Sequence, residues 1–201
     1  PKYGGFQAIW NAMQTSLKNN NVKINLESYP TKIYIENNKI KYLEIKNREE
    51  VVKINTENSI IVSSIPIFNL IKIMNIDNNN LLELSKKVRL RSMYLVIMKF
   101  SQNQTLPYRT LIFPEKEFIF NRIFEQNLYS RDTVEVNKSV IVADITFDKG
   151  RNFYDGEKIK KIVKEQINTL KYIDINKLES IKVELVEHAY VSPEEETRRN
   201  F

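Results

Sequence analysis

Apolar residues recur at helical spacing in two long stretches of the chain. The first stretch follows the double glycine Gly4–Gly5 and predicts an amphipathic helix that ends near Asn19. The second begins after Asp155, a residue suited to cap a helix, and predicts a helix that extends to Lys171. The apolar positions are Phe6, Ile9, Trp10, Met13 and Leu17 in the first, and Ile159, Ile162, Val163, Ile167 and Leu170 in the second. Residues 67–74 and 81–88 predict two shorter helices.

Alternating apolar and polar residues predict strands over most of the remaining chain. A turn at Asn37–Asn38 joins two of them into a hairpin. The run 59–66 is apolar without alternation, which is typical of a strand covered on both faces. The expected strands are 22–26, 33–35, 40–45, 51–56, 59–66, 92–100, 108–113, part of 117–130, 139–147 and 181–186. The sum predicts one α+β domain over residues 1–201, with a mainly antiparallel sheet and three or four helices.

The composition excludes several kinds of chemistry. The 201 residues include no cysteine, one histidine and four glycines. A thiolate zinc site, a cysteine nucleophile and a multi-histidine metal centre are therefore excluded, and so is a glycine-rich nucleotide loop within the chain. The sequence shows no motif that gives His188 a catalytic role, and we interpret it as a surface or packing residue. We predict no catalytic residue and no metal ligand.

The charge pattern says little about partners. The net charge of +6 arises from 31 basic and 25 acidic residues that are interleaved. The one basic run, Lys86–Arg91, is short, so the pattern does not favour nucleic-acid binding. No apolar run approaches the roughly 20 residues that span a bilayer, and the first residues do not resemble a signal peptide. We expect a cytoplasmic protein without a membrane span.

Three positions have both a binding and a structural interpretation. Arg122 lies among aromatic residues, where it either contacts an anionic substrate or pairs with Glu125 on an edge strand. Trp10 either faces a pocket at a helix N-terminus, whose amides favour anions, or packs in the core. Asp144 lies on an apolar strand and needs a partner if its side chain points inward.

The order of several short motifs resembles the central part of flavin-dependent amine oxidoreductases, a superfamily that includes protoporphyrinogen oxidase and UDP-galactopyranose mutase. The matching segments are PKYGGFQAIWNAM at 1–13, VKINLESYPTKI at 22–33, SIIVSSIPIFNLIKIM at 59–74, FNRIFEQNLYS at 120–130 and VEHAYVSPEE at 186–195. In that superfamily, glycine-rich FAD-binding motifs lie on both sides of this region. The resemblance implies a substrate domain, with 22–36 and 51–75 joining a missing FAD-binding domain.

The resemblance also implies roles for individual residues. Gly4 and Gly5 match a double glycine near the flavin, and Pro66 matches a proline after a returning strand. Pro30 stands where the family has a valine whose backbone meets the adenine, and proline has no amide N–H to donate there. For substrate contact we select Arg122, Tyr129 and Trp10.

The implied function is the substrate-recognition portion of an FAD-dependent oxidoreductase or flavin-using mutase. FAD would belong to the longer protein, and this piece alone would be inactive. The substrate would be a small molecule of unknown identity. An excised piece would expose apolar surface around Ile60–Leu70. The alternative from another class is a non-enzymatic α+β module whose sheet binds a protein partner or nucleic acid.

Overall fold

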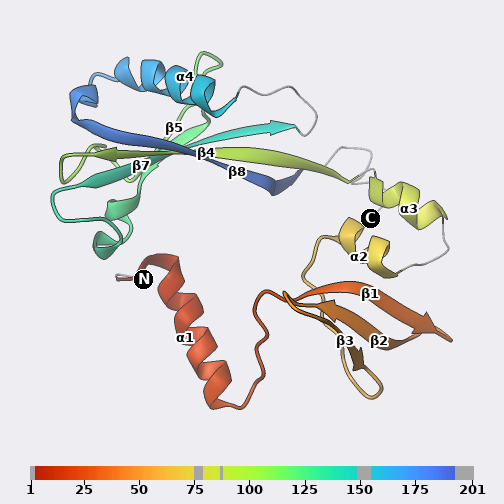
Figure 1. The fold of residues 1–201 in the computed structure, drawn as a ribbon. Coiled ribbons are helices and arrows are strands. Elements are labelled where there is room, and N and C mark those ends of the chain that lie inside the picture. The colour runs from red at the N-terminus through yellow and green to blue at the C-terminus, as the bar shows by residue number, and fades with distance from the viewer. Residues whose placement is uncertain (1–2, 75–78, 87, 149–154, 193–201) are drawn as a thin grey trace. The chain divides into compact units, whose positions relative to one another are not determined.

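The computed structural model describes residues 3–74, 79–86, 88–148 and 155–192 (Figure 1). These residues form two compact units. The first comprises the N-terminal segment up to Asn20 together with residues 90–192, and the second lies within residues 21–89. Each unit contains an antiparallel sheet, so the predicted α+β class and the mainly antiparallel sheet are confirmed.

The first unit is built on a five-stranded sheet in the order β5-β6-β7-β4-β8. The bounds are Arg89–Phe100 for β4, Thr110–Ile112 for β5, Arg122–Glu125 for β6, Ser139–Asp148 for β7 and Leu178–Ser192 for β8. β7 pairs antiparallel with both β4 and β6. Three short 3₁₀ helices follow strands or precede β8: η1 (Gln126–Leu128), η2 (Arg131–Thr133) and η3 (Ile175–Lys177).

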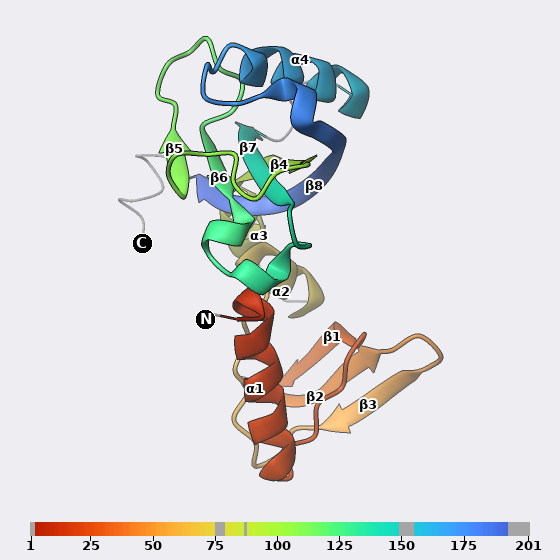
Figure 2. The ribbon, with the colours of Figure 1, turned by 90° about the vertical axis from the view of Figure 1, so that its left-hand side faces the viewer.

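The core of this unit lies between the sheet and helix α4 (Gly156–Asn168), which runs across one face of the sheet (Figure 2). The predicted cap is confirmed, because the Asp155 carboxylate accepts a hydrogen bond from the Lys158 amide at 2.8 Å. The helix ends three residues before the predicted Lys171. The fully buried side chains include Val96, Met98, Phe100, Ile123, Ile141, Ile145, Ile159, Val163 and Ile167.

Helix α1 (Gly5–Asn19) forms where the apolar stripe predicts it, yet none of its residues is buried. Phe6 and Trp10 are 75% and 61% exposed. The core interpretation of Trp10 is therefore wrong for this chain. The stripe stays partly exposed in the described part of the chain, from 42% for Ile9 and Leu17 to 75% for Phe6.

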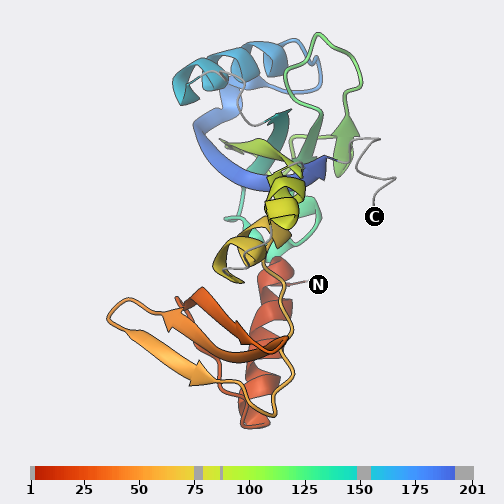
Figure 3. The same cartoon turned by 90° about the vertical axis from the view of Figure 1, so that its right-hand side faces the viewer.

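The second unit contains a three-stranded antiparallel sheet in the order β1-β2-β3 (Figure 3). The strands are β1 (Tyr29–Glu36), β2 (Lys39–Lys46) and β3 (Val51–Asn55), and they are followed by α2 (Ile67–Met74) and α3 (Asn79–Lys86). The predicted hairpin turn is confirmed. Asn37 and Asn38 both have positive φ, 50° and 58°, as a tight hairpin turn requires.

One face of this sheet carries two stacked tyrosine rings, with lysine ammonium groups over them. Tyr34 and Tyr42 stack with ring centres 3.8 Å apart, and the ammonium groups of Lys32 and Lys53 lie over their rings. The Tyr34 hydroxyl donates to the Glu44 carboxylate at 2.7 Å. That bond holds the pKa of Tyr34 above its ordinary value, because ionisation would break it.

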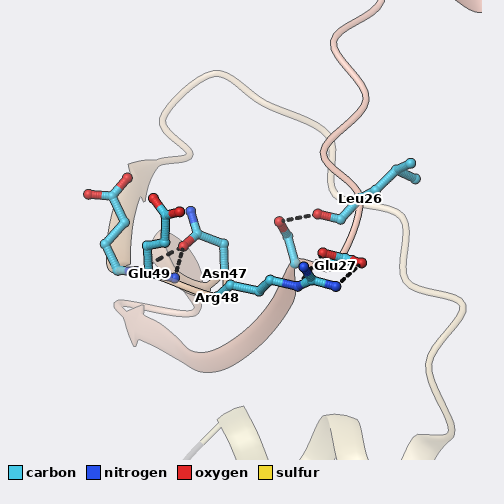
Figure 4. Close-up of polar contacts among 7 residues, drawn as sticks. Leu26, Glu27, Asn47, Arg48 and Glu49 are labelled. Carbon is cyan, nitrogen blue, oxygen red and sulfur yellow. Dashed lines mark hydrogen bonds and ion pairs between the residues drawn. The ribbon is translucent and has the colours of Figure 1, made fainter.

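The segment 22–26, which the sequence predicted to be a strand, is not one. Polar contacts of Glu27, directly after it, and of the turn before β3 lie next to this segment (Figure 4). Arg48 binds both carboxylate oxygens of Glu27, each at 2.5 Å, and Asn47 accepts two backbone amides in the turn before β3. Glu27 has φ of 53° and Asn21 has φ of 59°. These two residues flank the segment 22–26, and no described strand pairs with it, so the predicted strand does not form.

The predicted strand at 59–66 is also absent. Ile60 and Val62 are 94% and 90% exposed, and no described strand pairs with this segment. A strand needs a neighbour to satisfy its backbone hydrogen bonds. The expected apolar exposure of this region is confirmed.

Candidate functional site

The candidate site is a pocket of 580 Å³ in the first unit. Its walls come from the start of α1, from β5 and β6, and from the residues around η1. Two of the residues selected for substrate contact, Arg122 and Tyr129, lie together in it. The lining residues are Gly5, Phe6, Arg109, Thr110, Arg122, Phe124, Gln126, Tyr129 and Ser130.

An aromatic pair forms one wall of the pocket. The rings of Phe124 and Tyr129 meet edge to face, with centres 6.3 Å apart and planes at 89°. The Tyr129 hydroxyl shares a 2.6 Å hydrogen bond with the Thr110 hydroxyl, which ties the ring to β5. Tyr129 stays half exposed, so its ring is open to a ligand.

The alternation of β6 decides where Arg122 points. Arg122 and Phe124 share the pocket face, whereas Ile123 and Glu125 point to the core. The predicted alternative, an Arg122–Glu125 pair on an edge strand, is therefore wrong, and β6 is an inner strand.

Arg122 instead pairs with Asp144, its register partner on β7. The Arg122 Nε lies 2.8 Å from the Asp144 carboxylate, and its Nη2 also contacts that carboxylate. Asp144 is only 4% exposed, so an unpaired charge there would be costly. Asp144 therefore has the partner that its burial requires, and that partner is Arg122. The charge of the Asp144 carboxylate offsets that of the Arg122 guanidinium at the pocket wall.

Arg109 is the pocket residue that the sequence did not reveal. It lies directly before β5, is exposed, and has its guanidinium carbon 5.9 Å from the centre of the Tyr129 ring. Within the described ranges no carboxylate pairs with it. The predicted strand at 108–113 could have indicated Arg109. Pairing that strand with β6 brings Arg109 beside Glu125 and the aromatic run.

The loop that leads to Arg109 is fixed by a buried carboxylate. Glu125 is fully buried, and its Oε2 accepts the backbone amides of Thr105 and Leu106 at 3.0 and 2.6 Å. Its Oε1 accepts the side-chain amide of Asn127 at 2.8 Å. The Glu125 amide donates to the Arg109 carbonyl at 3.0 Å, so one residue holds both ends of this loop.

The N-terminus of α1 already holds an anion from the protein itself. The Asp132 carboxylate accepts the Gly4 amide at 2.9 and 2.7 Å, and Ser130 accepts the Gly5 amide at 3.2 Å. Hydrogen bonds from the Ser130 hydroxyl and then the Gly4 amide hold the pKa of Asp132 below its ordinary value, although desolvation opposes them. The free helix amides considered for Trp10 are thus bound by Asp132 and Ser130.

The double glycine has a structural reason in this turn. Gly4 and Gly5 have φ of 72° and 57°, a region that side chains disfavour. A Cβ on Gly4 would lie 2.8 Å from the Ala8 Cβ, and one on Gly5 would lie 3.1 Å from the Thr133 methyl group.

The other selected residues are not among those that line this pocket. Trp10 does not line it. Pro30 stands in β1, opposite Ile45, and the Pro66 carbonyl accepts two amides at the start of α2. Both prolines belong to the second unit, and their role toward a cofactor stays a prediction.

The described ranges contain neither a candidate metal cluster nor a candidate membrane-spanning helix. No group of three or more histidine, aspartate or glutamate residues there could hold a metal ion. No helix in those ranges is long and apolar enough to cross a bilayer.

No family model and no curated protein matches the chain. Solved structures do match its fold. Reduced UDP-galactopyranose mutase has a TM-score of 0.78 at 17% identity, over 100% of this chain and 43% of that one. An oxidoreductase from Methanosarcina mazei has a TM-score of 0.70 at 12% identity, over 92% and 43%. A protein assigned as a protoporphyrinogen oxidase, from Exiguobacterium sp. 255-15, has a TM-score of 0.61 at 13% identity, over 91% and 40%.

The chain has the fold of one part of these proteins. The resemblance predicted from the sequence is thereby confirmed for the fold. The chain spans less than half the length of each of the three.

Proposed function

We propose that the chain is the substrate-recognition portion of an FAD-dependent oxidoreductase or flavin-using mutase. The observation that carries this proposal is the pocket of Arg109, Arg122, Phe124 and Tyr129, in a fold shared with UDP-galactopyranose mutase. Guanidinium groups beside aromatic rings suit a small anionic substrate. The pocket binds and orients that substrate, and the flavin would supply the redox chemistry.

The described residues do not fit the pyrophosphate of FAD. Proteins commonly bind this group at a helix N-terminus that follows a glycine-rich turn. The one double-glycine helix start here is closed by Asp132, whose negative charge would repel a pyrophosphate. We therefore assign the cofactor to a part of a longer protein outside this chain, and expect the chain alone to be inactive.

The exposed segment 59–66 supports the same division. Ile60 and Val62 are the residues that a further domain would cover, since an apolar run of this kind is typical of an inner strand. In our proposal this segment becomes a strand of the flavin domain when that domain is present.

Flavin retention tests the proposal. The chain and the longer protein encoded by its gene would each be incubated with FAD, desalted, and scanned for visible flavin absorbance. We expect a yellow longer protein and a colourless chain. If neither retains flavin, the flavoenzyme proposal fails and the partner-binding module takes its place. If the chain alone retains flavin and turns over substrate, the assigned division is wrong.

A further inference from the structure

The pocket contains two guanidinium groups that differ in whether a carboxylate neutralises their charge. Arg122 is matched by the nearly buried Asp144, so together the two side chains contribute no net charge. Arg109 has no carboxylate partner in the described ranges. Among the described residues, Arg109 is therefore the lining cation whose charge no ion-paired carboxylate offsets.

A second carboxylate, Asp132, lies behind the lining residue Ser130 and does not itself line the pocket. Asp132 is hydrogen-bonded to Ser130, which lines the pocket, and its charge is held ionised at the start of α1. A ligand group bound between Arg109 and Arg122 gains attraction from the first and hydrogen bonds from the second. A second negative charge on that ligand would meet no second unpaired cation among the lining residues, and the carboxylates of Asp144 and Asp132 lie behind Arg122 and Ser130.

Aromatic rings supply the apolar part of the remaining lining, and Thr110, Gln126 and Ser130 supply its polar part. Phe124 and Tyr129 present their rings to the pocket, and Phe6 lies 75% exposed at its edge. The volume of 580 Å³ lies within the usual range of small-molecule sites, about 300–1,000 Å³. Because the Phe124 and Tyr129 rings touch edge to face, a planar apolar body can cover the open face of a ring but does not enter between the two.

We propose that this pocket selects a ligand with a single anionic group joined to a flat apolar body, and that it rejects diphosphates. The proposal rests on the proposed function, because it names the substrate class of the same site. It separates this chain from the UDP-galactopyranose mutase whose fold it shares, since the substrate named for that enzyme carries a diphosphate.

Binding to the 201-residue chain tests this without any flavin. The probes are 2-naphthoate, the uncharged 2-naphthamide, and UDP, titrated by calorimetry at one fixed ionic strength. We expect 2-naphthoate to bind at least about tenfold more tightly than UDP, because a second charge costs on the order of one such factor near the surface. We expect 2-naphthamide to bind more weakly than 2-naphthoate.

Variants locate the binding. Arg109→Gln should raise the Kd for 2-naphthoate by about tenfold to hundredfold, as expected for the loss of a charge-assisted contact. Arg131→Gln removes an equal charge from an exposed residue outside this pocket and should leave the Kd unchanged. Circular dichroism would confirm that both variants fold.

Three results would overturn the proposal: tighter binding of UDP than of 2-naphthoate, no binding of either, or an equal loss of affinity in the two variants. None of these depends on flavin, so failure here is distinct from failure of the flavin test. Retained flavin with preferred UDP binding would leave the flavoenzyme proposal standing and remove only this one.

Discussion

The buried carboxylate of Glu125 offers the sharpest test of how the pocket is held. Replacing it with alanine would leave the amides of Thr105 and Leu106 buried without an acceptor. Each unsatisfied donor costs about 1 to 3 kcal/mol, so the change should lower the free energy of unfolding by about 2 to 6 kcal/mol. That is a large part of the roughly 5 to 15 kcal/mol that stabilises a typical domain.

Urea unfolding, followed by hydrogen exchange of β6 and β7 peptides, measures this loss in the first unit. With an m-value of about 2 kcal/mol/M, the midpoint for Glu125→Ala should fall by about 1 to 3 M. Glu125→Gln keeps a carbonyl oxygen for the two amides but turns an NH₂ group toward Asn127, so its loss should be smaller. Glu115→Gln, at an exposed position, is the matched control and should change stability by less than about 0.5 kcal/mol.

The reasoning would be refuted if Glu125→Ala unfolded at the same urea concentration as the Glu115→Gln control. The buried contacts would then contribute nothing that water could not replace. A loss in Glu125→Gln equal to that in Glu125→Ala would contradict the role given to the two backbone amides.

Three other predictions concern the rest of the chain. Asp132→Ala should speed hydrogen exchange of the backbone amides at the start of α1. In the wild type, protection of the Gly4 amide should fall only when the pH drops below the ordinary aspartate range of about 4. The reason is that a carboxylate whose pKa is lowered in the folded state stabilises the fold at pH values above that range. A pH above about 10 should destabilise the second unit, because the pKa of Tyr34 is raised in the folded state and the stability that this contributes is lost when the hydroxyl ionises. Tyr34→Phe removes the hydrogen bond to Glu44. A pH series of thermal melts should therefore show a weaker alkaline dependence in this variant than in the wild type. Ile60→Ser should change the stability of this chain by less than about 0.5 kcal/mol but destabilise the longer protein measurably, and equal melting shifts in both would remove the proposed buried strand.

Local patterns predicted most of the regular structure. Helical spacing predicted α1 and α4, and alternation with the Asn37–Asn38 turn predicted the β1–β2 hairpin. These features depend on neighbours in sequence, so no distant contact was needed to recognise them. The prediction of a strand at 59–66 failed because a strand also needs a pairing partner, which a local pattern cannot identify, and no described strand pairs with this segment.

The site was predicted only in part. Arg122 and Tyr129 were selected from their place in the segment 120–130 that resembles the flavin-dependent superfamily, and both line the pocket. The prediction that Arg122 pairs with Glu125 was wrong. The choice between Glu125 and Asp144 depends on strand alternation and on the register of β6 against β7. Arg109 was missed because no local motif marks a residue that enters a site through strand pairing.

The central claim, that this pocket receives the substrate of a flavoenzyme, is tested most directly by adding 2-naphthoate to the flavin-loaded longer protein and recording the visible difference spectrum. We expect a saturable change in the flavin bands that is lost in Arg109→Gln and kept in Arg131→Gln. A flavin spectrum that stays unchanged while 2-naphthoate is shown to bind would contradict the claim, because the pocket would then lie apart from the cofactor.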